Sequence, residues 1–184
     1  MKRLVSMALL LAVVAIPAGA STFLVMDQKA LVQDSAAVVQ GRVLQINSFW
    51  DPTGTVVKTE ALVQVDDVIF GESPSVVVIE TFGGKVGNFY VEAHGFPTFA
   101  VNEELLLFLE AEKDGVQRVA GYQQGQYRIV RDNSGIEMAV PAFDAEANLL
   151  TKDGRPAARP QVLRLSTLKS QIRAEADRAG RVAN

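Results

Sequence analysis

The chain has 184 residues, of which 48% are hydrophobic and 21% charged, with a formal net charge of −3 and no cysteine. Without cysteine the chain has no disulfide staples and must be held together by core burial alone, and the length indicates one domain with its own core. Residues 21–150 carry eight Lys and Arg against eighteen Asp and Glu, whereas residues 151–184 carry eight against three. Because a phosphate backbone needs a positive footprint, we expect no nucleic acid partner for the acidic body.

The first twenty residues have the pattern of an export signal. Two basic residues precede an apolar run at 4–16, which is too short for a bilayer that needs about 20 residues. An A-x-A cleavage site closes the segment at residues 18–20. We therefore expect a signal peptide at 1–20 and an exported mature chain, periplasmic or secreted. No later stretch predicts a transmembrane segment.

The mature sequence predicts a short helix followed mainly by strands. Asp27 is placed to cap the helix, with Leu31 and Val32 as its apolar contacts. From residue 35 the period changes to two, and Gly41 marks a bend or bulge in the first strand. The fifth expected strand, at residues 116–130, is predicted to be interrupted at Gly121 or Gly125. The expected strands cover residues 35–50, 55–71, 75–84, 104–112, 116–130 and 136–141.

Long early strands with glycines at their bends are typical of a small closed barrel. We therefore predict a mainly β fold at residues 21–150, an OB-like closed β-barrel of five to six strands. Residues 151–160 have the Pro, Gly and charge content of a linker.

A basic C-terminal helix is expected after this linker, with Ser166 as its N-cap and Gly180 just past its end. Its narrow apolar stripe predicts packing outside the barrel, without entry into the core. The tail either lies against the acidic body or makes weak contact with an anionic surface.

Three segments resemble the netrin-like modules and the tissue inhibitors of metalloproteinases, and are similar to bacterial secreted proteins of unassigned function. They are "SAAVVQGRV", "VQVDDVIFGES" and "EELLLFL". The resemblance covers roughly residues 27–130 and implies an OB-fold module that binds a protein. The inhibitors use the amino group and carbonyl of an N-terminal cysteine to bind a protease zinc. This chain has no cysteine and offers Ser21 and Thr22 after cleavage.

Catalytic chemistry has little support in the sequence. His94 is the only histidine, and no G-x-S-x-G elbow provides a nucleophile beside it. A Glu92–His94 pair on one strand face is one reading, and a loop histidine beside a Gly-Phe-Pro turn is the other. Too few histidines and cysteines exist for a zinc site, and "DNSGIE" and "FGGKVG" favour turns over a calcium or phosphate loop. We assign no catalytic residue, metal or cofactor.

Aromatic residues near the predicted strand ends are the strongest functional lead. They either supply contact area for a ligand or plug the barrel mouth. The candidate binding residues are Trp50, Phe82, Phe89, Tyr90, His94, Phe96 and Phe99. We expect an exported, non-catalytic binding module that contacts a protein in the envelope or outside the cell, with inhibition of an exported protease as one form of that role. The alternatives are a structural envelope component with a basic tail and a hydrolase that uses His94.

Overall fold

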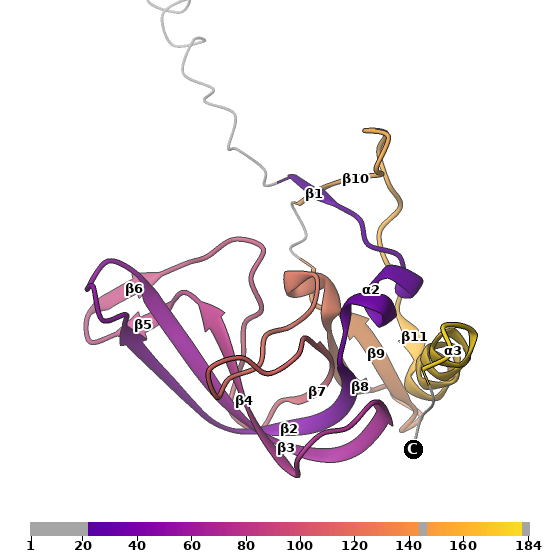
Figure 1. Cartoon of the computed structure of the whole chain (residues 1–184), viewed down its shortest axis with the longest axis horizontal. Coiled ribbons are helices and arrows are strands. Elements are labelled where there is room, and N and C mark those ends of the chain that lie inside the picture. Colours follow the sequence, from indigo (N-terminus) through magenta and orange to yellow (C-terminus); the bar gives the residue numbers. More distant parts are fainter. Residues whose placement is uncertain (1–21, 144–146, 182–184) are drawn as a thin grey trace, which may run out of the picture.

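The computed structural model describes residues 22–143 and 147–181, so the predicted signal peptide at 1–20 and Ser21 lie outside the described residues. Within these ranges the fold is mainly β with two α-helices (Figure 1). In chain order the elements are β1 (Thr22–Leu24), α2 (Gln28–Asp34), β2 (Ala37–Trp50), β3 (Val57–Phe70), β4 (Val76–Phe82), β5 (Gly84–Val86), β6 (Phe89–Val91), β7 (Glu104–Leu109), the 3-10 helix η1 (Tyr122–Gly125), β8 (Gln126–Arg131), β9 (Glu137–Pro141), β10 (Asn148–Leu150), β11 (Leu163–Arg164) and α3 (Leu165–Arg178).

One seven-stranded sheet organises the molecule, in the order β11-β9-β8-β7-β2-β3-β4, and all its neighbours are antiparallel. Two small sheets accompany it. β1 pairs with β10 in parallel, and β5 pairs with β6 as an antiparallel hairpin. Within residues 22–143 and 147–181, no helix has the length and hydropathy needed to cross a bilayer.

The hairpin of β2 and β3 is the longest ladder and follows from the sequence alternation. Each strand has 14 residues, and alternate residues of β3 from Val57 to Val63 are buried. The predicted bulge at Gly41 is confirmed by a register shift between Gln40 and Gly41. A Cβ at Gly41 would lie 2.2 Å from the Gln64 carbonyl oxygen, so only glycine lets the two strands approach this closely.

The predicted closed barrel is not supported, because the sheet is open. From β7 the ladder continues outward through β8 and β9 to β11, away from β4 at the other edge. Among the described residues, β4 and β7 are linked only by isolated bridges to the segment between them, Ile79 to Gln117 and Leu109 to Val119. The expected fifth strand is too short to complete this link, because Gly121 adopts φ 65° and starts η1. The break predicted near this glycine is thus confirmed.

β7 lies at the centre of two core clusters. All five residues from Leu105 to Leu109 are fully buried, and successive side chains point to opposite faces. Leu106 and Phe108 belong to a cluster that also contains residues of both helices. Leu105, Leu107 and Leu109 belong to a second cluster, on the inner face of β2, β3 and β4. A strand buried on both faces explains the continuous apolar run of this segment.

α3 contributes to the first cluster directly, which corrects the expectation that it would stay out of the core. Leu168, Ile172 and Ala176 are 0–1% exposed and pack with residues of β2, β7, β8 and β9. The narrow stripe is sufficient because the helix also contacts α2 and β11. The Ser166 cap is also wrong, since α3 begins at Leu165 without a side-chain cap.

The basic face of α3 meets the acidic body at one point. The Lys169 ammonium donates to Asp67 Oδ2 at 2.9 Å, and Arg173 approaches the same carboxylate at 3.8 Å. These pairs support the reading in which part of the basic tail lies against its own body.

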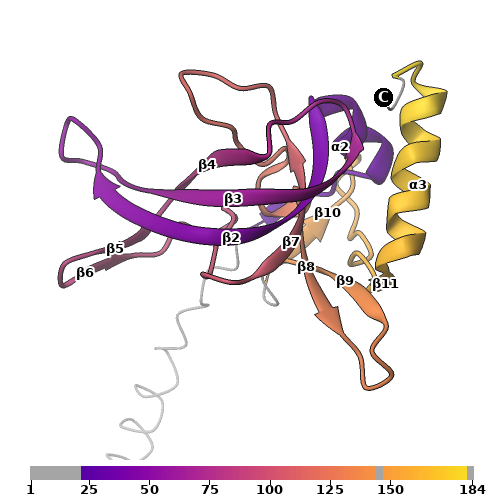
Figure 2. The ribbon, with the colours of Figure 1, turned by 90° about the horizontal axis from the view of Figure 1, so that it is seen from below.

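The distal halves of β2 and β3 extend past the start of β7 on the side opposite α3, and the β5–β6 hairpin lies beside them (Figure 2). β5 contacts both long strands, and Gly84 makes this possible. A Cβ there would lie 2.2 Å from Thr59 Oγ1 and 2.4 Å from Ser48 Oγ. This region carries the candidate site.

Candidate functional site

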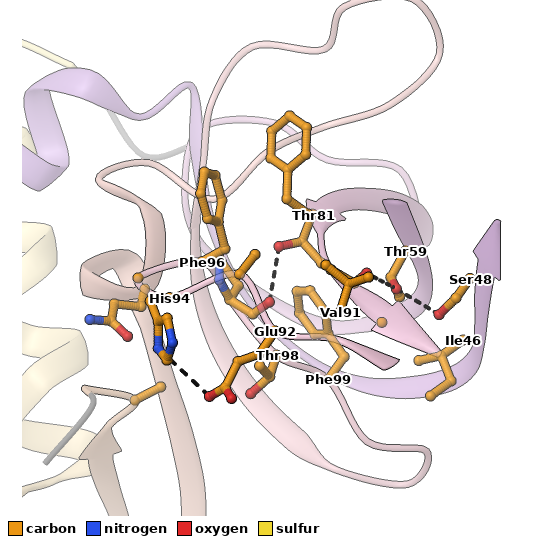
Figure 3. A pocket seen from close by; sticks show the side chains of 18 of the residues that line it. Ile46, Ser48, Thr59, Thr81, Val91, Glu92, His94, Phe96, Thr98 and Phe99 are labelled. Carbon is orange, nitrogen blue, oxygen red and sulfur yellow. Dashed lines mark hydrogen bonds and ion pairs between the residues drawn. The ribbon is translucent and has the colours of Figure 1, made fainter. Parts of the chain in front are cut away.

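A pocket of about 700 Å³ lies between β2, the β5–β6 hairpin, the loop at 92–99 and the end of β9. Its volume is within the usual range of ligand-binding clefts, about 300–1,000 Å³. Figure 3 shows Ile46 and Ser48 at one side of it and His94 with Glu92 at the other. The pocket gathers these sequence-predicted binding residues: Phe82, Tyr90, His94, Phe96 and Phe99.

Hydroxyl groups fix the pocket walls to the sheet (Figure 3). Thr81 Oγ1 donates to the Pro97 carbonyl at 2.9 Å, which ties the loop at 92–99 to β4. Thr59 Oγ1 donates to the Gly83 carbonyl at 2.7 Å. Because the Thr59 proton is committed to that bond, Ser48 is the donor in the 2.7 Å contact between the two hydroxyls. Both threonines are buried, so water does not compete for the hydrogen bonds that hold the pocket walls in place.

The predicted aromatic residues divide into two groups. The Phe96 ring makes edge-to-face contacts with Phe82 at 4.9 Å and with Tyr122 at 5.1 Å. Trp50 and Phe89 form a second pair, 6.3 Å apart, and neither lines the pocket. Sequence reasoning treated the aromatics as one cluster, whereas the structure provides a pocket wall and a separate rim pair.

Exposure differs strongly among these side chains. Phe89 and Tyr90 are 66% and 70% exposed, which makes them the most open large hydrophobic residues of the described chain. Phe99 is partly buried and packs against the second core cluster. Its position is therefore that of a plug residue, while the β5–β6 tip offers free contact area.

His94 lies at the edge of the pocket in a turn closed by the bond from Phe96 N–H to the Ala93 carbonyl at 3.2 Å. Its Nδ1 is 3.7 Å from Glu92 Oε1, beyond hydrogen-bond range, and both side chains are more than half exposed. This exposed arrangement matches the loop histidine more closely than a desolvated acid–base pair.

The polar groups of the pocket come partly from residues that the sequence did not indicate. Gln123 is 5% exposed and lines the pocket, yet its Nε2 has no hydrogen-bond partner among the described residues. Arg128 donates to Thr98 Oγ1 at 3.3 Å and pairs with Glu103 at 2.7 Å. A buried amide donor without an acceptor is costly, so it marks a place where a ligand oxygen would be stabilised.

Sequence reasoning missed Tyr122 and Gln123 because "AGYQQG" reads as an interrupted strand. The two glycines that flank the segment were the available signal, since they indicate a local break. The break is a turn of 3-10 helix with Tyr122 at φ 59°, an uncommon conformation for a bulky residue. That turn presents Tyr122 to Phe96 and Gln123 to the pocket.

Most of the other predicted features lie away from the pocket. Thr22 is exposed in β1 and pairs with Asn148 in β10. In "DNSGIE" the Asp132 carboxylate accepts the N–H groups of Ser134 and Ile136, as expected for a turn. "FGGKVG" runs from the end of β4 through β5 into the next turn, so the predicted turn is in part a strand, and residues 82–85 line the pocket. Among the described residues, no group of three or more His, Asp or Glu is placed to hold a metal ion.

No protein-family model, curated protein or solved structure matches the chain. The resemblance to netrin-like modules therefore stays a prediction.

Proposed function

We propose that the protein is an exported binding module that captures a protein partner through the pocket and the exposed tip of the β5–β6 hairpin. The observation that carries the proposal is the continuity of these two features. Tyr90 lines the pocket and is 70% exposed, and the adjacent Phe89 contacts Trp50 at the end of the β2–β3 hairpin. Aromatic side chains of this kind supply much of the binding energy at protein interfaces.

The protease-inhibitor form of this role is a narrower proposal that depends on the resemblance. The inhibitors act through the N-terminal amino group, and the corresponding Ser21 lies outside the described residues. In either form of the role, the pocket residues serve as contacts for a partner surface. The envelope-component alternative depends on the basic tail, in which Lys169 and Arg173 face Asp67.

The test is affinity capture from the cell envelope and the culture fluid with matched variants. Phe89→Ala and Tyr90→Ala each remove an exposed ring, so we expect an unchanged melting temperature and at least about tenfold weaker binding of the captured protein. Val130→Ala is the control, because Val130 is 46% exposed on β8 and does not line the pocket. Equal capture by wild type and all three variants would show that the surface has been assigned wrongly.

A further inference from the structure

The edge of β2 that faces away from β3 lacks a partner strand along its distal half. β7 pairs with β2 only from Ala37 to Arg42. One residue further, Val43 N–H donates to the Glu103 carbonyl at 3.0 Å, and Asn102 N–H donates to the Val43 carbonyl at 2.8 Å. From there to Trp50, no described strand forms backbone pairs with β2 on this side, although β5 contacts β2 near Ser48 and β3 continues along the other side.

The register identifies which backbone groups point to the open edge. Asp51 N–H donates to the Val56 carbonyl at 2.8 Å, which makes them a hydrogen-bonded pair. Hydrogen-bonded and non-hydrogen-bonded pairs alternate along an antiparallel ladder. The pairs 50↔57, 48↔59 and 46↔61 are therefore of the second kind, and no register shift interrupts them. The N–H and C=O groups of Ile46, Ser48 and Trp50 thus point away from β3.

The side chains of these same residues lie on the inner face of the hairpin. Ile46 pairs with Ala61 and Ser48 with Thr59, and both partners are buried on that face. Ile46 and Ser48 also line the pocket. A strand added along the open edge would therefore direct every second side chain toward the pocket, as β2 itself does.

We propose, on the basis of the function proposed above, that the partner contributes an extended polypeptide segment that pairs with the edge of β2 at residues 46–50. Main-chain hydrogen bonds to β2 supply affinity, and the pocket selects an apolar side chain at alternate positions of the segment. The buried Gln123 amide donates to a carbonyl oxygen of the segment.

The shape of the pocket favours a segment of a partner over a second copy of this chain. The loop at 92–99 and residues 140–143 wall the space that β2 lines, so the site is bounded on its far side. A volume of about 700 Å³ accommodates a few residues of one extended chain, whereas a second copy would bring the whole β2–β3 hairpin to the same space. An exposed strand edge is also a known hazard for aggregation, which gives a bound segment a protective effect.

Amide hydrogen exchange tests the pairing residue by residue on the isotope-labelled exported protein. The probe is a twelve-residue peptide selected from a displayed random library on the wild-type protein. In the free protein, we expect fast exchange at the amides of Ile46, Ser48 and Trp50, and slow exchange at Asn47 and Phe49, which bond β3. With peptide bound, the three edge amides should slow by at least about tenfold.

Methylation of the peptide nitrogens provides a matched control on the ligand side. Alternate residues of an added strand donate to β2, so N-methylation should abolish binding at every second position and be tolerated between them. Loss of binding at methylated positions that do not alternate along the peptide would contradict strand pairing.

The remaining outcomes separate this inference from the proposed function. Peptides that require Tyr90 but leave the edge amides unprotected would overturn the strand pairing and leave the binding role standing. If the selection yields no peptide whose binding depends on Tyr90, the proposal that the partner contributes an extended segment would be overturned. Tyr90-dependent capture of a folded protein would still support the proposed role as a binding module. A dimer in sedimentation, with edge amides protected in the absence of peptide, would identify a second copy as the occupant and overturn the proposal.

Discussion

At the scale of single residues, glycines decide where the strands of this protein come close together. Gly71 follows β3 at φ 76°, and a Cβ on it would lie 2.2 Å from the Ala36 carbonyl oxygen. Gly54, in the turn between β2 and β3, has a similar φ of 70° but no atom within 4 Å of its Cβ position. A comparison of substitutions at the two positions therefore separates the cost of backbone strain from the cost of a steric clash.

Gly54→Ala should cost about 1–2 kcal/mol, the penalty of an L-residue in the left-handed region. Gly71→Ala should cost more than this, because the same penalty combines with a clash against backbone atoms that cannot rotate away. Urea denaturation followed by circular dichroism measures both free energies of unfolding. Equal losses would show that the chain around Ala36 relaxes to accept the methyl group.

Asp51 illustrates how a turn residue couples to pH. Its carboxylate accepts the Thr53 hydroxyl and the N–H groups of Val56 and Thr55. These bonds, led by that from Thr53, lower the pKa of Asp51 from 3.8 to about 2. Since the folded pKa is below the unfolded one, the stabilisation is complete above about pH 4 and is lost as the pH falls through about 2.

Asp51→Ala should therefore lower the melting temperature at neutral pH, and its difference from wild type should narrow between pH 4 and pH 2. Asp51→Asn keeps an acceptor oxygen without the charge, so it should show no contribution from this site to the pH dependence. Thermal melts across this interval measure the effect. A difference that stays constant for Asp51→Ala would refute the assigned pKa shift.

At the scale of elements, local alternation predicted the longer strands, and a capping pattern predicted the short helix. The Asp27 cap is confirmed by the bond from Ala30 N–H to Asp27 Oδ1 at 2.8 Å, and Leu31 and Val32 are buried as expected. The hairpin turn at Asp114-Gly115 is confirmed by positive φ at both residues. These features depend on neighbouring residues, so the sequence contains their determinants.

The role of α3 depends on contacts that no local pattern indicates. Ile172 is fully buried among strands that precede it by more than thirty residues. Its truncation to alanine should cost about 2–5 kcal/mol, since it leaves a cavity between helix and sheet. Arg173→Ala, on the partly exposed face, should cost less than about 1 kcal/mol, as is usual for surface ion pairs.

Chemical denaturation of both variants measures the contrast. A small effect of Ile172→Ala would mean that the helix is dispensable for the fold.

At the scale of the whole molecule, β7 joins two cores that would otherwise be separate. Leu106 faces the helices and Leu107 faces the inner side of β2, β3 and β4, and both are fully buried. Because neighbouring residues of one strand belong to both clusters, we expect the clusters to unfold together.

Leu106→Ala and Leu107→Ala should each cost about 2–5 kcal/mol and each leave a single unfolding transition. Calorimetry is the measurement, with equal calorimetric and van 't Hoff enthalpies as the expected result in both variants. Two resolved transitions in either variant would show that the clusters are independent folding units.

The sequence by itself determined the mainly β class, the positions of most strands and turns, and the aromatic composition of the candidate site, because each of these depends on residues close together in the chain. It favoured a closed barrel, since bends and alternation report strand curvature but not which edges meet. Only the tertiary structure decided that the sheet stays open, that α3 completes a core and that Gln123 reaches the pocket. The tertiary structure also decided that the distal half of β2 is unpaired on one side, because this depends on how far β7 extends beside it.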